Sequence, residues 1–466
     1  MHASRLTPHA ALQGRKALVV GLGDTGLSCA RWLLGQGAKV RATDSRMVPP
    51  HAERLREVHP EVALKLGVFK PADFDWADLV VVSPGVPLAT PEIQAALRAG
   101  KDVVGDVELF ARAIVGTSSK VIAITGSNGK STVTSLVGHL CQAAGLKTVV
   151  AGNIGLPVLD ALTAQEATAP DVYVLELSSF QLETTASLTP DAATVLNLSE
   201  DHMDRYADMT GYAAAKARIF HGDGVQVLNR DDALVMAMGE NGRRIYSFGL
   251  DKPVSGQWGL LRHEDGYWLA EGEQASLAVD ALPITGLHNA ANALAALALC
   301  RALGLDYAPL VAALKTFKGL PHRVEKVATV KGVSFYDDSK GTNVGATVAA
   351  LKGMTCPVVL IAGGDGKGQD FSPLKEAVKH ARGVVQIGRD GPLIAAAIGD
   401  AAPVFRAEGM EAAVRRGFEL ARPGDAVLLS PACASFDMFR NYAHRAEAFV
   451  QAVQALKAEQ EGVHVL

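Results

Sequence analysis

The chain has 466 residues, and a chain of this length normally divides into two to four domains. Its charge is nearly balanced, at −4 with a pI near 6.4 and no long basic run, which argues against nucleic acid and anionic membranes as partners. Five widely spaced cysteines are typical of free thiols in a reducing compartment rather than of a disulfide or zinc framework.

No targeting or membrane-spanning segment is expected. The residues before Ala17 lack the apolar stretch of a secretory signal, and no apolar run has the length that crosses a bilayer. We therefore expect a soluble, cytoplasmic protein.

The first predicted elements are a strand, a glycine-rich turn and a helix. The strand over residues 15–20 leads into Gly21-Leu-Gly-Asp-Thr-Gly26, and the next strand ends on Asp44. This pattern matches the dinucleotide-binding fingerprint, in which an acidic residue about 20 positions on meets a ribose hydroxyl. It predicts a nucleotide or pyrophosphate here without saying which. A further strand from Leu79 ends in Ser83-Pro84-Gly85, which is either an ordinary turn or part of a ligand crevice.

A phosphate-binding loop follows the small polar connector 114–120, which is the first predicted domain boundary. Residues 121–124 form a buried strand that breaks into Thr125-Gly-Ser-Asn-Gly129, and Lys130 opens a helix towards Cys141. Backbone N–H groups and a helix N-terminus then face an anion, the Lys adds charge, and the hydroxyl of Ser131 can hold Mg²⁺. The glycine spacing departs from the general P-loop. Gly-Lys-Ser at a strand-to-helix junction nevertheless predicts a nucleoside triphosphate.

Polar groups follow the next two predicted strands. Glu176 ends the apolar run 171–176, where it is either an edge charge or a metal-binding carboxylate, and Ser131 favours the metal. The strand at 193–197 leads into Glu200-Asp-His-Met-Asp-Arg205. A helix over 211–220 then carries Lys216, which taken alone is typical of a solvated helix lysine.

Residues 254–282 alternate with turn residues and predict a small antiparallel hairpin inserted in an α/β domain. The helix that begins near Gly286 places Asn289 and Asn292 three apart, hence on one face. Capping explains Asn289 alone, whereas two amides on one face can read a base edge.

The segment 319–324, stiffened by Pro321, is the second predicted boundary. Beyond it, three apolar strands near 333, 358 and 426 each end in a loop rich in Gly, Ser or Asp. This repetition predicts a parallel sheet with ligand groups at its carboxyl edge.

Taken together, the motifs resemble those of the Mur ligases over essentially the whole chain. They occur in the family's order: Thr125-Gly-Ser-Asn-Gly-Lys-Ser131, Glu176-Leu-Ser-Ser179, Glu200-Asp-His-Met-Asp204, His288-Asn-Ala-Ala-Asn292, Pro321-His-Arg323 and Asp338-Ser-Lys340. The resemblance implies an α/β protein of three domains. These are a Rossmann-like UDP-binding domain (1–115), a P-loop ATPase domain with a parallel sheet and a small antiparallel insert (116–320), and a Rossmann-like domain for ATP and the amino acid (321–466).

Further motifs make the chain most similar to the family member that joins D-glutamate to UDP-N-acetylmuramoyl-L-alanine. They are Gly363-Gly-Asp-Gly-Lys367, Ser430-Pro-Ala-Cys-Ala-Ser-Phe-Asp437, Asp44-Ser-Arg46 and Ser83-Pro-Gly85. The resemblance implies that ATP phosphorylates the substrate carboxylate and that the amine of D-glutamate then attacks the acyl phosphate. It also implies a monomer in peptidoglycan precursor synthesis, with a uridine nucleotide rather than NAD at residues 21–26.

The resemblance also assigns roles to individual residues. The role of binding ATP falls to the phosphate loop, two amides, an arginine and a carboxylate. These residues are Gly126, Ser127, Asn128, Gly129, Lys130, Ser131, Thr132, Asn289, Asn292, Arg323 and Asp338. Ser131 and Glu176 would hold one Mg²⁺, and His202 with a carbamylated Lys216 a second. The catalytic set is Lys130, Glu176, His202, Lys216 and Arg323. Substrate contacts are given to Thr25, Asp44, Ser83, Gly85 and Asn153 on the uridine and muramoyl side and to Thr342, Lys367, Ser435 and Phe436 around D-glutamate.

Other functions stay open on the sequence. One is a folylpolyglutamate-type synthetase or a Mur ligase with another amino-acid acceptor, although the N-terminal nucleotide fingerprint argues against the folate enzyme. A second is an NAD-dependent oxidoreductase, and a third is a nucleotide-sensing module without catalysis. Glu176, His202 and Arg323 exceed what binding alone requires.

Overall fold

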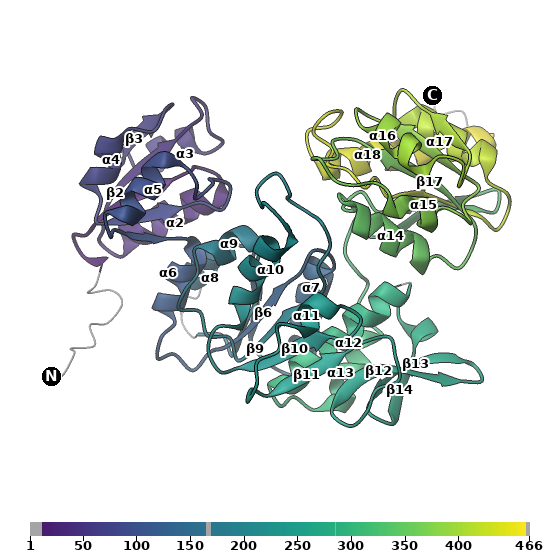
Figure 1. Cartoon of the computed structure of the whole chain (residues 1–466), viewed down its shortest axis with the longest axis horizontal. Coiled ribbons are helices and arrows are strands. Elements are labelled where there is room, and N and C mark those ends of the chain that lie inside the picture. Colours follow the sequence, from purple (N-terminus) through teal and green to yellow (C-terminus); the bar gives the residue numbers. More distant parts are fainter. Residues whose placement is uncertain (1–11, 165–168, 285, 463–466) are drawn as a thin grey trace.

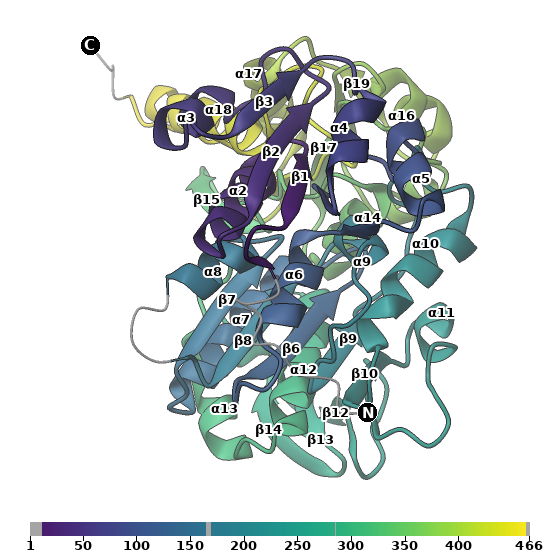
Figure 2. The ribbon, with the colours of Figure 1, turned by 90° about the vertical axis from the view of Figure 1, so that its left-hand side faces the viewer.

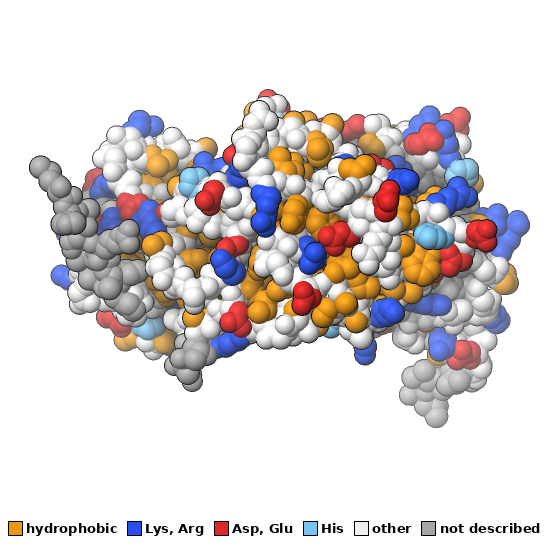
Figure 3. All heavy atoms as spheres, turned by 90° about the horizontal axis from the view of Figure 1, so that it is seen from below, with side chains coloured by type: hydrophobic (Ala, Val, Ile, Leu, Met, Phe, Trp, Pro, Cys, Tyr) orange, Lys and Arg blue, Asp and Glu red, His pale blue; other side chains and the backbone are white. Residues whose placement is uncertain are grey.

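The computed structural model describes residues 12–164, 169–284 and 286–462 and contains three α/β bodies, each with its own sheet. Figures 1 and 2 show the two outer bodies on the same side of the central one. None of the helices in these ranges is long and apolar enough to cross a bilayer. The face in Figure 3 mixes Lys and Arg with Asp and Glu, as the balanced charge of the chain leads one to expect.

The N-terminal sheet has five parallel strands in the order β3-β2-β1-β4-β5. Its inner strand β4 is Leu-Val-Val-Val and is buried throughout, as expected for a parallel strand covered on both faces. The elements are β1 (Lys16–Val20), α2 (Asp24–Gly35), β2 (Lys39–Asp44), α3 (Ala52–Val58), β3 (Ala63–Leu66), α4 (Pro71–Trp76), β4 (Leu79–Val82), α5 (Pro91–Arg98), β5 (Asp102–Val104) and α6 (Asp106–Ala113).

The central sheet has nine strands in the order β14-β13-β12-β11-β10-β9-β6-β8-β7. The strands β12, β13 and β14 at one edge of this sheet pair antiparallel with one another. The predicted hairpin is therefore a three-stranded meander. The elements are β6 (Lys120–Thr125), α7 (Lys130–Ala143), β7 (Thr148–Gly152), α8 (Val158–Thr163), β8 (Val172–Glu176), α9 (Ser179–Glu183), β9 (Ala192–Val195), α10 (Met209–Ala217), β10 (Val225–Asn229), α11 (Ala233–Met236), β11 (Ile245–Phe248), β12 (Gln257–His263), β13 (Gly266–Glu271), β14 (Gln274–Ala278), α12 (Leu287–Ala302) and α13 (Tyr307–Leu314).

The C-terminal sheet has six strands in the order β15-β16-β20-β17-β18-β19, and only the edge strand β15 is antiparallel. The predicted parallel sheet is therefore confirmed. The elements are β15 (Glu325–Val330), β16 (Val333–Asp337), α14 (Val344–Gly353), β17 (Val358–Gly363), α15 (Pro373–Ala377), β18 (Gly383–Ile387), α16 (Gly391–Ile398), β19 (Val404–Arg406), α17 (Met410–Leu420), β20 (Ala426–Leu429) and α18 (Tyr442–Gln460).

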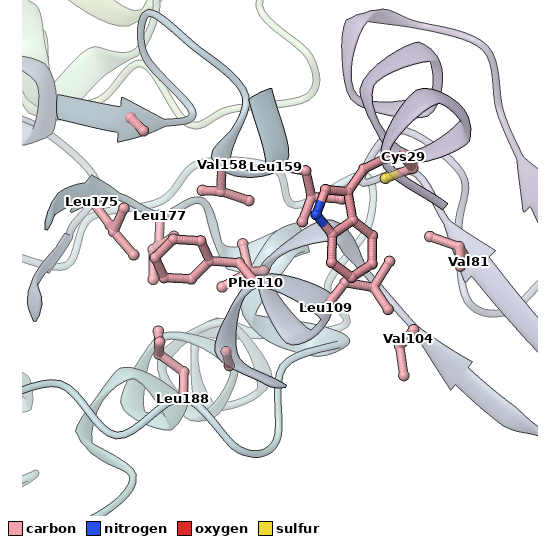
Figure 4. Packing of buried hydrophobic residues seen from close by; sticks show 14 of the residues in the cluster. Cys29, Val81, Val104, Leu109, Phe110, Val158, Leu159, Leu175, Leu177 and Leu188 are labelled. Carbon is pink, nitrogen blue, oxygen red and sulfur yellow. The ribbon is translucent and has the colours of Figure 1, made fainter. Parts of the chain in front are cut away.

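The hydrophobic core runs without a break from the N-terminal body into the central one. Figure 4 shows Phe110 of α6 between side chains of the central sheet, such as Leu175, and the N-terminal strands that carry Val81 and Val104. Helix α6 lies before the boundary predicted at residue 115, yet it packs on α8 and α9. The C-terminal body, in contrast, has two core clusters of its own that begin at residue 324.

Candidate functional site

The phosphate loop lies between β6 and α7, and β6 is flanked by the parallel strands β8 and β9 of the central sheet. Gly129 has a left-handed φ of 82°, and a β-carbon there would come within 2.7 Å of Asn292 Oδ1. Glycine therefore lets the amide of α12 approach the loop. Asn197 holds the loop in place, because its side chain accepts a hydrogen bond from the backbone N–H of Asn128 and donates one to the backbone carbonyl of Asn128. Lys130 Nζ folds back onto the carbonyls of Gly126 and Ser127 at 2.7 and 2.9 Å.

Two buried carboxylates lie beside this loop, each with an oxygen that has no hydrogen-bond partner in the described part of the chain. They are Oε2 of Glu176, at the end of β8, and Oδ1 of Asp201. The other oxygen of Glu176 accepts from Asn153 Nδ2 at 2.7 Å. Buried carboxylate oxygens without donors are suited to a hard cation, and the hydroxyl of Ser131 adds a third oxygen. The residues present thus fit Mg²⁺. Asp201 was missed as a candidate, although it stands in the polar run 200–205.

Lys216 is buried, with 2% of its surface exposed, so the interpretation of this residue as a solvated helix lysine is wrong. The short Ala-rich helix α10 turns it inward, where Nζ donates to the carbonyl of Gly126 at 3.0 Å and to Thr125 Oγ1 at 3.3 Å. Burial, helped by the nearby charge of Lys130, lowers the pKa of Lys216 well below its usual value. This shift favours the neutral amine over the ammonium.

His202 stands on the polar loop before α10 with a left-handed φ of 59°, and its ring meets Phe180 edge-on at 4.7 Å. Burial lowers the pKa of His202, and the charges of Lys367 and Lys130 add to this effect. A neutral imidazole can act as a metal ligand.

A cavity of about 160 Å³ opens between α12 and the C-terminal body. Asn292 Nδ2 donates to Asn289 Oδ1 at 3.1 Å, so both amides face the cavity from one side of α12, as predicted. Asp338 enters from the opposite wall, and burial raises its pKa to about 7. His288 and Lys340 also line this cavity and were not selected from the sequence, although each lies within a quoted motif. The cavity thus offers amides for a base and a carboxyl for a sugar hydroxyl.

Arg323 reaches across the second predicted boundary to the phosphate loop. One of its guanidinium nitrogens donates to Ser131 Oγ at 3.0 Å. The neighbouring residues His322 and Val324 both have left-handed φ angles, of 63° and 50°, in the linker that carries it. Asn343 makes a second bridge, because its amide donates to Asn128 Oδ1 at 3.1 Å. The C-terminal body therefore touches the phosphate loop through polar groups.

A large cleft of about 910 Å³ lies between the N-terminal and central bodies. It is lined by all five residues predicted for the uridine and muramoyl side, namely Thr25, Asp44, Ser83, Gly85 and Asn153. Two of these brace the walls, since Asp44 Oδ2 accepts from the N–H of Leu22 at 2.7 Å and Ser83 Oγ donates to the carbonyl of Gly21 at 2.8 Å. Burial would raise the pKa of Asp44, but the hydrogen bonds from Arg46 and Leu22 lower it overall.

The cleft is also lined by basic residues that were not predicted from the sequence: Arg31, Arg46, His51 and Arg54. Of these residues, only Arg46 belongs to a motif that could have indicated its role, because it ends the Asp44-Ser-Arg46 loop. The others come from α2 and from the segment 51–58, where nothing local marks them. This arrangement suits an anionic ligand such as a diphosphate.

The four residues predicted for the acceptor lie on loops at the carboxyl edge of the C-terminal sheet. Thr342 follows β16, Lys367 follows β17, and Ser435 and Phe436 follow β20. Lys367 has a left-handed φ of 52°, and its N–H donates to Asp365 Oδ1 at 3.1 Å. Ser435 is buried, whereas Phe436 is 72% exposed. These roles stay predictions.

Three family profiles match successive parts of the chain. They are the Mur ligase MurD-like N-terminal domain over residues 15–105, the Mur ligase middle domain over 124–300 and the Mur ligase glutamate ligase domain over 322–433.

Curated proteins match nearly the whole chain. The UDP-N-acetylmuramoylalanine–D-glutamate ligase of Methylobacillus flagellatus is 60% identical over 452 residues, which cover 96% of this chain and 99% of that protein. The ligase of the same name from Thiobacillus denitrificans is 59% identical over 471 residues, with 97% and 98% covered.

Two solved structures share the fold at low sequence identity. The pseudomurein peptide ligase type C of Methanothermus fervidus has a TM-score of 0.60 at 18% identity and covers 95% of this chain and 100% of its own. The UDP-N-acetylmuramate-alanine ligase of Thermotoga maritima has a TM-score of 0.59 at 20% identity, with the same coverage.

Proposed function

The chain belongs to the Mur ligase family, and we infer from this membership that it is an ATP-dependent ligase that joins D-glutamate to UDP-N-acetylmuramoyl-L-alanine. The reaction is a step of peptidoglycan precursor synthesis. One observation in the structure supports it most directly. Asn153 lines the large cleft and also hydrogen-bonds Glu176 beside the phosphate loop, so a carboxylate bound in the cleft can meet the γ-phosphate of ATP.

The chemistry requires a carboxylate to become an electrophile. Its oxygen attacks the γ-phosphorus, ADP leaves, and the resulting acyl phosphate has phosphate as a good leaving group. The amine of D-glutamate then attacks the acyl carbon, the C–O bond to phosphate breaks, and the amine loses a proton as the amide forms. Two anions meet in the first step, so Lys130 and Arg323 lower the barrier by neutralising charge on the transferring phosphoryl group.

We assign two Mg²⁺ ions to this place. Ser131 and Glu176 would hold one, and His202 with a modified Lys216 the other, while Asp201 offers a further oxygen. When bound, Mg²⁺ neutralises phosphate charge and orients the phosphoryl group.

The proposed modification of Lys216 is a carbamate. The nitrogen lone pair attacks the carbon of CO₂, one C–O π bond opens onto oxygen, and a proton leaves the nitrogen. The product is an anionic oxygen donor of the kind that Mg²⁺ prefers. The lowered pKa of Lys216 supports this step, because only the neutral amine reacts.

An assay of phosphate release tests the function. The purified chain is given ATP, Mg²⁺ and UDP-N-acetylmuramoyl-L-alanine, together with D-glutamate, L-glutamate or no amino acid. We expect sustained release only with D-glutamate. Equal release with L-glutamate, or with another amino acid in a panel, would assign the chain to a ligase of different acceptor specificity.

A further inference from the structure

Arg445 is a buried arginine with no salt-bridge partner among the described residues, although Asp437, Asp337 and Asp338 lie near enough to oppose the lowering of its pKa by burial. It lies in the first turn of α18, and none of its surface is exposed. No carboxylate oxygen within the described ranges lies at salt-bridge distance from its guanidinium, which bonds instead to neutral oxygens. Such a group is poorly explained by stability, because an apolar side chain of similar volume in place of a buried ion often stabilises a fold as well or better.

The three hydrogen bonds of Arg445 join two neighbouring loops. Nε and Nη2 donate to Ser339 Oγ and to the Ser339 carbonyl, at 3.0 and 2.7 Å, and Nη1 donates to the Cys433 carbonyl at 3.0 Å. Ser339 follows β16 and Cys433 follows β20, which are adjacent parallel strands. The planar guanidinium therefore fixes the spacing of the two loops where the strands separate.

Each of these loops belongs to a different part of the proposed site. Ser339 stands between Asp338 and Lys340, which both line the nucleotide cavity. Cys433 leads into Ser435, one of the residues assigned to D-glutamate. Ala434, between them, exchanges two backbone hydrogen bonds with Asp365, whose carboxylate accepts from the N–H of Lys367. The hydrogen bonds of Arg445 thus connect the loop that lines the nucleotide cavity with the loop next to Lys367, the lysine assigned to the acceptor.

We propose that Arg445 is a positioning residue that holds the acceptor loop at a fixed distance from the nucleotide loop, so that the acceptor amine meets the activated carboxyl group. This inference rests on the proposed function, because that function assigns the two loops. Burial lowers the pKa of Arg445 to about 10, so the guanidinium keeps its charge and all its donors at neutral pH.

The test separates the two half-reactions. Formation of the acyl phosphate needs ATP and the muramoyl substrate and is measured by trapping with hydroxylamine, without amino acid. Amide formation needs D-glutamate as well. We expect Arg445→Met to keep most of the trapping rate, to lower amide formation by about tenfold or more and to raise the KM for D-glutamate, with the KM for the muramoyl substrate unchanged.

Arg382→Met is the matched control. Arg382 also ties two segments of the same sheet, by donating to Asp425 at 3.0 Å, but it does so at the opposite edge, just before β18 and β20. We expect it to lower the thermal midpoint without changing the ratio of the two half-reactions. Arg445→Lys keeps the charge and part of the hydrogen bonding, so it should recover part of the amide formation and serve if the Met variant does not fold.

An unchanged ratio of the half-reactions in both Arg445 variants, with lower stability only, would make this residue purely structural and overturn the inference. Failure of the proposed function gives a different result, because the unaltered chain would then release no phosphate in response to D-glutamate.

Discussion

The amine of Lys216 lies against the phosphate loop, within hydrogen-bond distance of the Gly126 carbonyl and with Lys130 close enough to lower its pKa. An ammonium there would repel a metal ion, whereas a carbamate would bind it. We expect Lys216→Arg to abolish turnover and to leave nucleotide binding within a few-fold, since the loop itself is unaltered. In the unaltered chain, ¹³C-labelled bicarbonate should give a carbamate signal that the variant lacks. Full activity of the variant would contradict the assignment.

Lys367 is the cation assigned to a carboxylate of D-glutamate, and its backbone is held by Asp365. A charge-assisted hydrogen bond that forms only with the acceptor predicts a selective effect. We expect Lys367→Ala to raise the apparent KM for D-glutamate by about tenfold and to change that for ATP little. Lys375→Ala, an exposed residue of the same body, is the control. An equal rise in both KM values would assign Lys367 to the nucleotide instead.

Asp106 connects pH to stability. It is fully buried at the start of α6, and Oδ1 has no hydrogen-bond partner among the residues that the structure describes. Burial raises its pKa from 3.8 to about 6. The folded state therefore binds more protons than the unfolded state between these pH values. The free energy of unfolding falls as pH rises through this window, and above about 6 the stabilising contribution is lost.

The neutral variant Asp106→Asn should remove this dependence. We expect it to be more stable than the unaltered chain at pH 8, by at most about 3 kcal/mol, and to lose that advantage towards pH 4. Thermal or urea unfolding across this range measures the difference. Asp75→Asn, at an exposed position, should show no such trend. A destabilised Asn variant at pH 8 would mean that the ionised carboxylate is itself stabilised in the folded state, and would contradict the raised pKa.

At the scale of elements, the polar loop between β9 and α10 connects the residues assigned to Mg²⁺ with the cleft between the N-terminal and central bodies. Arg205 donates to the carbonyl of Pro84 at 2.8 Å and to Glu183 at 2.6 Å, and its guanidinium lies 3.9 Å from the centre of the Phe180 ring. His202 packs on the same ring. The loop is thereby held to both the N-terminal body and α9.

We expect Arg205→Ala to raise the KM for the muramoyl substrate and to lower kcat, together by on the order of tenfold to a hundredfold, because His202 loses its support. Arg218→Ala is the matched control, since Arg218 also bonds to carbonyls at α9 but does not touch this loop. Similar losses in both variants would point to a general weakening of α9 and not to positioning of His202.

Local patterns predicted the strands and the groups that immediately follow them. Glu176 ends β8, and Gly129 and Lys130 lie in the turn between β6 and α7, so chain order fixes their place at the carboxyl edge of a parallel sheet. The role of Lys216 came from a family resemblance, since its burial depends on how α10 packs against the phosphate loop. Asp201 and Arg205 contact segments distant in sequence, and His288 and Arg54 line cavities together with such segments. A single sequence does not encode this proximity in any local period.

At the scale of the whole molecule, the two outer bodies are attached differently. The N-terminal body shares a continuous apolar core with the central body. The C-terminal core clusters contain only residues beyond 323, and the C-terminal body reaches the phosphate loop through polar contacts such as Arg323 to Ser131 and Asn343 to Asn128. Separating a shared apolar core exposes apolar surface to water, whereas water can replace polar contacts. Motion should therefore be concentrated in the C-terminal body.

This asymmetry predicts which distances change when ligands bind. Groups assigned to ATP lie on both sides of the linker 319–324, so binding favours a closed arrangement. We expect ATP with the muramoyl substrate to lower the radius of gyration measured by solution scattering. Spectroscopic labels at exposed Arg98, Lys252 and Lys379 report on the three bodies separately. The distance from 252 to 379 should shorten while that from 98 to 252 stays constant, because only the first pair spans the linker. If the radius and both distances stay constant at saturating ligand, the C-terminal body is not hinged. If only the distance from 98 to 252 changes, the hinge lies instead in the core that the N-terminal and central bodies share.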